Sequence, residues 1–349
     1  MSSKRTSASG PRATSIEDVA LAASVSTATV SRVLNNPRLV APDTARRVQQ
    51  AIDELAYRPN VLAKGLSTRK TQVLGIALPD IFGEFYSELL RGADQEARQS
   101  GYHLLVSSEA RMRDGDTQES ALGFGLIDGL AVMITEPDKR ILPEASRASV
   151  PLVVLDGEPQ GVPFDSVVVD NVAGTREAVQ HMLESVPPEK CCFVGGPEEN
   201  FDTAQRAAAF RAALAERRHR ASPDQLSFGQ YTTDWGFRWA SERLASRACR
   251  DRCCGVLAGN DEIAYGIMLA CQAAGTAIPG EMRLIGFDDS RLASLVRPRL
   301  SSVRVPAAEI GAAAIRLLVA RIREPGHEPT HLTLPTKLVI RESSIASRG

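Results

Sequence analysis

The sequence predicts an all-α N-terminal unit joined to a larger α/β body built on two doubly wound parallel sheets. Three observations carry this prediction. Apolar residues recur at helical spacing through residues 15–55, apolar runs alternate with helical stretches from residue 72 onward, and positive charge is concentrated in the first part of the chain. A chain of 349 residues is long enough for two or three domains with a sizeable hydrophobic core.

The N-terminal unit is predicted from three amphipathic segments. The first follows Ser15, a favourable N-cap, and the second follows an AASVS turn. The third begins at Pro42, which suits the first position of a helix. The apolar residues of these segments recur three and four positions apart and should form one small core: Ile16, Val19, Ala20, Ala23, Val30, Val33, Leu34, Val48, Ile52 and Leu55.

The second segment also has a polar face that suits DNA. Over residues 27–34 its outward side carries four small residues and one guanidinium group: Thr27, Ala28, Thr29, Ser31 and Arg32. Such a face fits a major groove and brings hydrogen-bonding groups to the base edges. The alternative is a three-helix domain that binds no charged partner.

A basic stretch, residues 57–71, follows the helical unit. Asn60 can cap a short helix over residues 61–66, but Gly65 and the shortness of the segment make that helix unstable in isolation. Two leucines, the second of them Leu66, stand there among four cationic side chains. Apolar side chains flanked by cations suit insertion into a minor groove, with folding only on DNA. A basic linker whose leucines pack on the next domain is the alternative.

The charge distribution favours a nucleic-acid partner for the N-terminal part. Residues 1–72 hold 11 basic and 5 acidic residues, a net charge of +6, whereas the remainder holds 30 basic and 37 acidic residues, a net charge of −7. Residues 1–14 are rich in serine and basic residues without an apolar cluster, which predicts a disordered tail. Neither a secretory leader nor an apolar run of membrane-spanning length is found, so we expect a cytoplasmic protein without a membrane partner.

The six cysteines are best interpreted as buried thiols. They occur as the pairs Cys191-Cys192 and Cys253-Cys254 and singly as Cys249 and Cys271, and no two sets have the spacing of a zinc site. A metal or redox role for Cys249, Cys253 and Cys254 is the alternative. We expect neither a metal nor a cofactor.

From residue 72 onward, short apolar runs alternate with helical stretches. Continuous apolar runs indicate strands that are covered on both faces, which is typical of parallel sheets. The first group of strands is expected at residues 73–78, 103–106, 129–134 and 152–155. The pattern restarts after Asp165, with strands at residues 167–169, 192–195, 226–228, 256–258 and 284–287. Two sheets are therefore predicted, with the division near Asp170.

Polar and aromatic residues follow the carboxyl ends of these strands, where open α/β sheets bind ligands. The candidates are Asp80, Phe82, Phe85, Tyr86, Asp156, Asn200, Asp202, Arg206, Trp235, Asn260, Asp261, Asp288 and Asp289. Aromatic faces with carboxylates and a guanidinium group suit a polyhydroxylated ring, which stacks on the faces and hydrogen-bonds to the charged groups. Structural alternatives remain: Asp202 and Asp261 as helix caps, Arg206 on a solvated face, and Phe85 in the core.

Motifs for catalysis or nucleotide binding are missing from the sequence. It contains no GxGxxG after the first strand, no Walker loop, no HExxH and no GxSxG elbow. The five histidines are scattered, so neither a metal site nor a catalytic triad is indicated. The adjacent carboxylates Asp288 and Asp289 are too weak an indication of glycosidase chemistry. We therefore expect that the protein is not an enzyme.

The segment from Ser15 to Asn35, followed by residues 60–66, resembles the lactose-repressor (LacI/GalR) family of bacterial transcription regulators, and the similarity runs from about residue 15 to 343. It implies two sets of major-groove residues: base readers at Thr27, Ala28 and Arg32, and holders of phosphates or neighbouring bases at Ser26, Thr29, Ser31 and Asn35. It also implies minor-groove and hinge contacts at Asn60, Ala63, Lys64 and Leu66, with Leu66 as the inserted side chain. The turn position usually filled by glycine is Ser24, at a cost of roughly 1 kcal/mol if its backbone is left-handed.

In the body, the resemblance selects eight candidates as effector contacts: Phe85, Tyr86, Asn200, Asp202, Arg206, Trp235, Asn260 and Asp288. Asp156, which follows the strand at residues 152–155, is added to this set from its position at a strand end. The FGEFY sequence after the first strand departs from the common NPFF pattern of the family, which leaves the identity of the effector open at that wall. The family has a periplasmic-binding-protein-like fold. It implies that the helix over residues 307–322 returns to the first sheet and that the tail crosses once more.

These inferences predict a disordered tail (1–14), a helix-turn-helix DNA-binding domain (15–58), a hinge (59–71) and an effector-binding and dimerisation domain (72–349). The last is expected to contain an N-subdomain of about 72–170 plus 303–332 and a C-subdomain of about 171–302 plus 333–343. The predicted function is that of a homodimeric transcription regulator, most often a repressor in this family. Its affinity for double-stranded operator DNA would be controlled by a small effector, a sugar or sugar derivative. The alternatives are a solute-binding protein for a sugar transporter and a cytosolic sugar-modifying enzyme.

Overall fold

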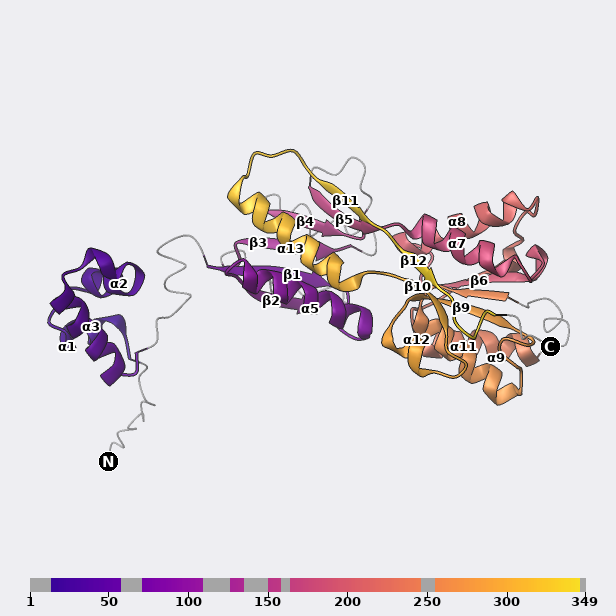
Figure 1. The fold of residues 1–349 in the computed structure, drawn as a ribbon, viewed down its shortest axis with the longest axis horizontal. Helices are drawn as coiled ribbons and strands as arrows, with labels where there is room; N and C mark the ends of the chain where they lie inside the picture. Colours follow the sequence, from indigo (N-terminus) through magenta and orange to yellow (C-terminus); the bar gives the residue numbers. More distant parts are fainter. Residues whose placement is uncertain are drawn as a thin grey trace, which may run out of the picture. The chain divides into compact units, whose positions relative to one another are not determined.

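The computed structural model divides into two compact units, residues 1–71 and 72–349, which are described separately (Figure 1). The structure describes residues 14–57, 71–108, 126–134, 150–157, 164–245 and 255–345, and within these ranges the side chain of Asn35 is left out. The predicted tail and almost all of the predicted hinge therefore lie outside the described residues.

The N-terminal unit contains the helices α1 (Ile16–Ala22), α2 (Thr27–Asn35) and α3 (Pro42–Glu54), with a 3-10 helix, η1 (Pro37–Leu39), after α2. Val19, Val30 and Val48, one from each α-helix, have no exposed surface and form the centre of its core. The backbone N–H of Ser15 donates to Asp18 Oδ2 at 2.8 Å, and the N–H of Asp18 donates to Ser15 Oγ at 3.2 Å. Ser15 therefore caps α1, as predicted.

The turn between α1 and α2 holds Ser24 in the left-handed region, with a φ of 54°. An L side chain is strained there, so Ser24→Gly is expected to stabilise the N-terminal unit by about 0.5–1 kcal/mol. Hydrogen exchange of the buried Val30 and Val48 amides in the full chain measures the change. Ala22→Gly, at an ordinary helical position, should destabilise the unit by a similar amount. Stabilisation by both substitutions would contradict the strain at Ser24.

The first sheet of the body has the strand order β11-β5-β4-β3-β1-β2, and its described strands are all parallel. Their bounds are β1 (Val73–Leu78), β2 (His103–Ser108), β3 (Gly129–Met133), β4 (Leu152–Leu155), β5 (Asp165–Val169) and β11 (His331–Leu334). β5 belongs to this sheet, although the second group of predicted strands began with it. The helices α5 (Glu84–Gln99) and α13 (Ala307–Arg323) lie side by side in this lobe (Figure 1).

The second sheet has the order β12-β10-β9-β8-β6-β7. Its bounds are β6 (Cys191–Gly195), β7 (Leu226–Phe228), β8 (Gly255–Ala258), β9 (Arg283–Asp288), β10 (Ser301–Arg304) and β12 (Lys337–Val339). Helices α7 (Asn171–Met182) and α8 (Phe201–Glu216) cover one face, and α9 (Thr233–Ala245) and α11 (Asp261–Ala274) cover the other (Figure 1). Short 3-10 helices, η2 (Pro188–Lys190) and η3 (Pro223–Gln225), precede β6 and β7.

The chain passes between the sheets after β5, after β10 and after β11. The last two crossings follow Arg304 and Leu334, one or two residues beyond the expected boundaries at 303 and 333. α13 packs against β3, β4 and β5, so it returns to the first sheet, as the resemblance implied. In this arrangement the carboxyl ends of both sheets face the junction between the two lobes.

One edge differs from the predicted all-parallel sheets. β12 pairs with β10 in antiparallel fashion. Only two residues separate β11 from β12, so the chain enters the second sheet directly from the junction. β12 therefore runs antiparallel to β10, its neighbour at the edge of the sheet. A parallel strand at this position would need a longer crossover, usually a helix.

The two long helices of the first lobe cross closely. A Cβ on Gly92 would lie 1.8 Å from the carbonyl oxygen of Ala308, and one on Gly311 would lie 2.0 Å from that of Leu89. Glycine is therefore required where α5 and α13 touch. This packing fixes the first turn of α5 at the junction between the lobes.

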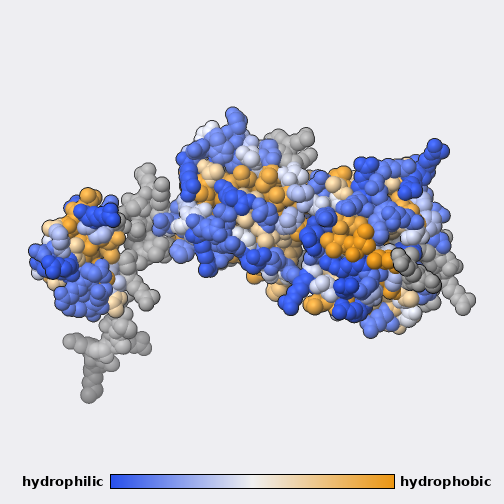
Figure 2. Space-filling view, in the orientation of Figure 1, coloured by the Kyte–Doolittle hydropathy of each residue, from blue (hydrophilic) through white to orange (hydrophobic). Residues whose placement is uncertain are grey.

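The body surface in Figure 2 shows apolar residues in patches separated by polar ones. Several exposed apolar side chains stand on loops, such as Phe82, which is 80% exposed. In the part of the chain that the structure describes, no helix combines the length and the apolarity needed to cross a bilayer.

The carboxylate of Asp165, at the start of β5, is fully buried against α13. Arg321 donates two hydrogen bonds of 2.8 Å to it, and the N–H of Thr330 donates a third of 2.7 Å. Burial opposes ionisation, but these hydrogen bonds outweigh it and hold the pKa of Asp165 below its usual range.

Arg321→Met is expected to destabilise the body by about 3 kcal/mol at pH 7, because the charge of Asp165 loses its partner. Since the native pKa of Asp165 is lowered, the stabilisation is complete above the unfolded pKa of about 3.9 and is lost as the pH falls through the native value. Urea unfolding between pH 7 and pH 3 should show the difference between wild type and variant shrinking. Arg98→Met, at an exposed pair with Asp94, should cost less than about 1 kcal/mol. A pH-independent difference for Arg321→Met would contradict this role.

Candidate functional site

α2 carries the predicted DNA-reading residues. Ser26, Thr27, Ala28 and Arg32 are exposed, Thr29 and Ser31 are half-buried, and the side chain of Asn35 is among those left out. Val30 and Val33 face the core, so the exposed residues lie on the opposite side of the helix. Ser26 is also the N-cap of α2, because its hydroxyl accepts a hydrogen bond of 3.2 Å from the N–H of Thr29. A phosphate contact by Ser26 would therefore share the hydroxyl with the cap.

The positive charge of the N-terminal part lies mainly outside its helices. Residues 14–57 hold four basic and five acidic residues, whereas residues 1–13 and 58–71 hold three and four basic residues and no acidic one. The predicted hinge contacts Asn60, Ala63, Lys64 and Leu66 lie outside the described residues. If α2 reads bases as predicted, most of the charge for phosphate contacts has to come from the flanking stretches.

In the body, strand ends place the predicted effector residues at the junction between the lobes. Asp156 directly follows β4, Asp288 ends β9, and Asp202 and Arg206 lie on the first turns of α8 after β6. Asp156 and Asp288 have positive φ angles of 56° and 106°. Such strain in non-glycine residues is typical of binding and catalytic sites.

Arg206 is the centre of this cluster and is 5% exposed. Its Nε donates to Asn171 Oδ1 at 2.8 Å, its Nη1 to the carbonyl oxygen of Gly259 at 2.7 Å, and its Nη2 to Asp202 Oδ2 at 3.4 Å. The guanidinium group also lies over the ring of Phe287, 3.8 Å from the centroid. Arg206 is therefore a buried, protein-bound cation, and the alternative of a solvated face is excluded.

Two more carboxyl groups, those of Asp156 and Asp288, share this electrostatic environment. Asp156 is 5% exposed and Asp288 is half-buried, and neither side chain hydrogen-bonds to a described residue. Burial raises the pKa of both well above the usual range; the charge of Asp202 adds to this effect at Asp156, and that of Asp261 at Asp288. Arg206 acts in the opposite direction on both groups.

The predicted asparagines serve partly as caps. Asn200 Oδ1 accepts from the N–H of Thr203 at 3.0 Å and begins α8, and Asn260 Oδ1 accepts from the N–H of Ile263 at 2.9 Å and begins α11. Each amide keeps an NH₂ group that can donate to a ligand. Trp235 is half-buried, and its indole N–H donates to the carbonyl oxygen of Gly195 at 3.1 Å.

Asp261 has a structural role instead. It is 2% exposed, and its carboxylate accepts from the N–H of Ser290 at 2.7 Å and from the hydroxyl of Ser302 at 2.6 Å. Burial raises its pKa to about 7, although these hydrogen bonds act in the opposite direction. Asp261 thus fixes the loop that follows Asp288.

The aromatic wall comes from the first turn of α5. Phe85 and Tyr86 are half-buried and meet edge to face, with ring centroids 5.4 Å apart. Burial, followed by the charge of Asp156, raises the pKa of Tyr86 above its usual range. Tyr86 therefore belongs to the Arg206 cluster, across the junction.

Three residues of the cluster were not predicted from the sequence. Asn171 donates to Asp202 Oδ1 at 2.8 Å besides holding Arg206, Phe287 stacks under the guanidinium group, and the hydroxyl of Tyr231 lies 2.6 Å from that of Thr203. Burial raises the pKa of Tyr231 to about 12. Asn171 and Tyr231 follow β5 and β7, so the rule of strand ends could have found them.

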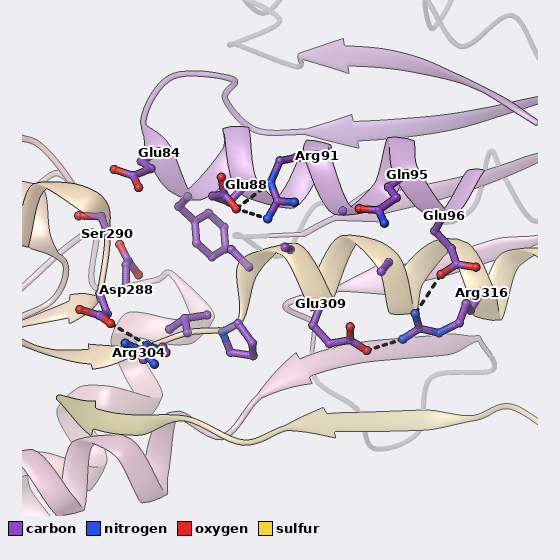
Figure 3. Close-up of a pocket in the computed structure, with 18 of the residues that line it drawn as sticks. Glu84, Glu88, Arg91, Gln95, Glu96, Asp288, Ser290, Arg304, Glu309 and Arg316 are labelled. Carbon is purple, nitrogen blue, oxygen red and sulfur yellow. Dashed lines mark hydrogen bonds and ion pairs between the residues drawn. The ribbon is translucent and has the colours of Figure 1, made fainter. Parts of the chain in front are cut away.

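A cavity of about 600 Å³ lies elsewhere, along α5, α13 and the loop before α12 (Arg291–Leu295) (Figure 3). Of the predicted effector residues only Phe85 and Asp288 line it, so it is not the predicted site. Along its walls Arg91 pairs with Glu88, and Arg316 pairs with Glu96 and Glu309.

The cysteines provide no metal site in the described ranges. Cys191, Cys192 and Cys271 are buried, while Cys249, Cys253 and Cys254 lie outside the described residues. No group of three or more histidine, cysteine, aspartate or glutamate side chains suited to a metal occurs in the described part of the chain.

Comparison with known proteins gives a family match in the helical unit and another in the body. Residues 15–60 match the model of bacterial regulatory proteins of the lacI family, and residues 189–344 match that of the periplasmic binding protein-like domain. Catabolite control protein A of Priestia megaterium is 33% identical over 332 residues, which cover 94% of this chain and 98% of that protein.

Two solved structures show the same architecture. The complex of the transcriptional regulator CelR with cellobiose is 28% identical, with a TM-score of 0.67 and coverage of 95% of this chain and 99% of that one. The lac repressor dimer bound to operator and the anti-inducer ONPF is 23% identical, with a TM-score of 0.82 and coverage of 96% and 100%, which shows the fold. These matches decide against a transporter's binding protein and against an enzyme. The chain belongs to the lacI family of bacterial regulatory proteins and is a DNA-binding transcription regulator.

Proposed function

We propose that this regulator is a homodimeric repressor that binds a pseudo-palindromic operator and responds to a small effector bound in its body. The observation that supports this proposal most directly is the lacI-family match of residues 15–60, together with the exposure of Thr27, Ala28 and Arg32 on α2. In a dimer, each α2 enters one major-groove half-site. The lac repressor, whose fold this chain shares, was solved as a dimer on its operator, and this supports the arrangement.

The phosphate contacts are assigned to Ser26, Thr29, Ser31 and Asn35 and to the basic stretch 58–71. Within that stretch, Asn60, Ala63, Lys64 and Leu66 form the minor-groove set, and the two copies of Leu66 open a central base step. The excess of basic residues there supports this assignment. Because the regulator acts on DNA, we place it in the cytoplasm.

The effector site is the Arg206 cluster, and a sugar or sugar derivative is its ligand. Carboxyl groups, asparagine NH₂ groups and the aromatic side chains Tyr86 and Trp235 suit hydroxyl groups on a ring. The cellobiose complex of CelR supports this ligand class. A ligand that binds one relative orientation of the lobes better than another shifts their equilibrium, and with it the ability of the two hinges to order on DNA.

A hydrogen bond between the lobes supports this coupling. Glu84 Oε1 accepts from the backbone N–H of Arg291 at 2.7 Å, and Figure 3 shows Glu84 next to Ser290 at this point. Between described residues outside the three crossing segments, it is the one side-chain hydrogen bond that joins the lobes. Glu84 is two residues from Tyr86, and Arg291 is three residues from Asp288, so this bond and the effector site share α5 and the β9–α12 loop.

Glu84→Ala is expected to speed hydrogen exchange of the Arg291 amide about tenfold, because the removed hydrogen bond is worth about 1 kcal/mol or more. Exchange measured by NMR on the full chain resolves this amide. Glu88→Ala on the same helix removes a carboxylate that pairs with Arg91 within α5, and it should leave the Arg291 amide unchanged. Equal protection in wild type and Glu84→Ala would mean that the lobes are not joined here.

In vitro transcription tests the proposed function. An operator selected by the protein is placed across a bacterial promoter, and run-off transcript is measured with rising protein concentration. A repressor lowers the transcript, and a compound that binds the body changes this effect at least about tenfold. Unchanged or increased transcript at saturating protein would overturn repression.

A further inference from the structure

We infer that the effector is a polyhydroxylated compound that carries no negative charge, which excludes phosphorylated and carboxylated sugars. The inference rests on the proposed function, because it concerns the ligand of the same site. It adds the charge class of the ligand, which the aromatic and polar residues alone leave open.

The cluster brings three carboxyl groups to one cation. Asp156, Asp202 and Asp288 all act on Arg206, which is the one cation among the described residues with a strong effect on Asp156 and Asp288. Asp202 is already paired with Arg206 at 3.4 Å. The groups that remain for a ligand therefore carry excess negative charge or excess acceptors.

Two other described arginines near β9 do not correct the balance. Arg304 and Arg341 both form ion pairs with Asp289, which follows β9. Arg304 Nε lies 2.7 Å from Asp289 Oδ2, and Arg341 Nη2 lies 2.6 Å from Asp289 Oδ1. The carboxylate of Asp289 is almost fully buried between them, so these two guanidinium groups are paired away from the cluster.

Arg206 itself is poorly placed to capture an anion. A guanidinium group has five N–H donors, and three of those of Arg206 donate to Asn171, Gly259 and Asp202, which leaves one on each of Nη1 and Nη2. Its face is stacked on Phe287. Strong capture of a phosphate or carboxylate uses two parallel N–H donors, and an anionic ligand on the remaining two would share the positive charge of Arg206 with the carboxylate of Asp202.

Asp156 shows what the ligand has to supply. Asp156 is 5% exposed and its side chain hydrogen-bonds to no described residue, so a ligand can be the partner of its carboxyl oxygens. An ionised Asp156 accepts from a hydroxyl or ammonium group, and a protonated one still has an acceptor oxygen. Asp288, on the facing lobe, is half-buried, and its side chain also hydrogen-bonds to no described residue. An anionic ligand would meet like charge or would have to force both groups to stay protonated.

The neighbouring groups favour hydroxyls as the donors. The hydroxyl of Tyr86 and the NH₂ group of Asn200 lie in the same cluster and can donate to ligand oxygens, whereas the hydroxyl of Tyr231 donates to Asn200 Oδ1 at 3.3 Å and can accept from a ligand. A hydroxyl group both donates and accepts, so it can bridge a carboxyl group and a tyrosine. A ligand with several hydroxyls, with or without an amino group, satisfies the cluster.

A charge series on shared carbon skeletons tests the inference. Thermal shift and then calorimetry on the full-length chain compare neutral pentoses, hexoses and disaccharides, amino sugars, sugar acids and sugar phosphates. We expect binders among the neutral and amino compounds, and the phosphate or acid of each bound skeleton should bind at least about 30-fold more weakly. A phosphate or acid that binds more tightly than its neutral parent would overturn the inference, as would binders found only among the anions.

Two variants test which residues discriminate against anionic ligands. Asp156→Asn and Asp288→Asn should each reduce the preference for the neutral compound over its phosphate about tenfold, while Asp94→Asn, at an exposed pair on α5, should not. An unchanged preference in both site variants would overturn the assignment, and the wild-type series decides if a variant fails to fold. Operator binding without ligand is measured in parallel. Normal operator binding with a preference for anions rejects this inference alone, whereas absent operator binding rejects the proposed function.

Discussion

Arg32→Ala is expected to abolish the preference of the protein for its operator over random-sequence DNA. Arg32 is the guanidinium group on the exposed face of α2, and an arginine bidentate to a base carries about 1–3 kcal/mol of discrimination. A dimer makes two such contacts, so operator affinity should fall by about 30-fold to 10,000-fold, while affinity for random duplexes falls only slightly. Fluorescence anisotropy with both duplexes at one salt concentration measures the two affinities.

Arg47→Ala provides the matched control, since Arg47 is an exposed arginine on α3 and not on the reading face. It removes the same charge and should weaken both duplexes by a similar, small factor. If Arg32→Ala also weakens operator and random DNA equally, Arg32 contacts phosphates only, and α2 does not dock as proposed.

Arg206→Ala is expected to remove the effector response and to destabilise the body by about 3–5 kcal/mol. The half-buried Asp202 would be left without its cationic partner, and Asn171 would lose the group that it holds. The structure therefore makes this substitution a poor test of ligand binding alone. Urea unfolding measures the stability, and an effector titration of the operator complex measures the response.

Asp288→Asn separates the two effects. The side chain of Asp288 hydrogen-bonds to no described residue, so its loss should cost little stability, yet the effector concentration for half response should rise at least about tenfold. Asp94→Asn, at an exposed pair on α5 outside the cluster, is the control and should leave the response unchanged. A normal response in Asp288→Asn would place the effector elsewhere.

Much of the fold follows from local patterns. Apolar spacing predicts the helices around Val19, Val30 and Val48, and continuous apolar runs predict nine of the twelve described strands. The short strands β10, β11 and β12 have no such run and were not predicted. The left-handed backbone of Ser24 agrees with the family resemblance, in which glycine usually fills this turn position. The antiparallel direction of β12 is not predictable, because it depends on which sheet the chain has just left, and periodicity carries no such information.

The position of the effector cluster can be predicted from the sequence, but the contacts among its residues cannot. Strand ends place Asp156, Arg206 and Asp288 at one junction, but the sequence gives no indication that Asn171 and Phe287 hold the guanidinium group. Partners of that kind come from helices and strands that pack together only in the folded body. The N-terminal charge illustrates the same limit, since the net value of +6 hides helices that hold one more acidic than basic residue.

Selection from a pool of random duplexes by the purified full-length chain probes DNA recognition even though the operator sequence is not specified in advance. If each α2 reads a half-site in a dimer, repeated rounds enrich one pseudo-palindrome whose half-sites are about one helical turn apart or a multiple of it, and Arg32→Ala fails to enrich it. A pool that stays random after several rounds at low salt, where phosphate contacts are strongest, would contradict sequence-specific recognition by this protein.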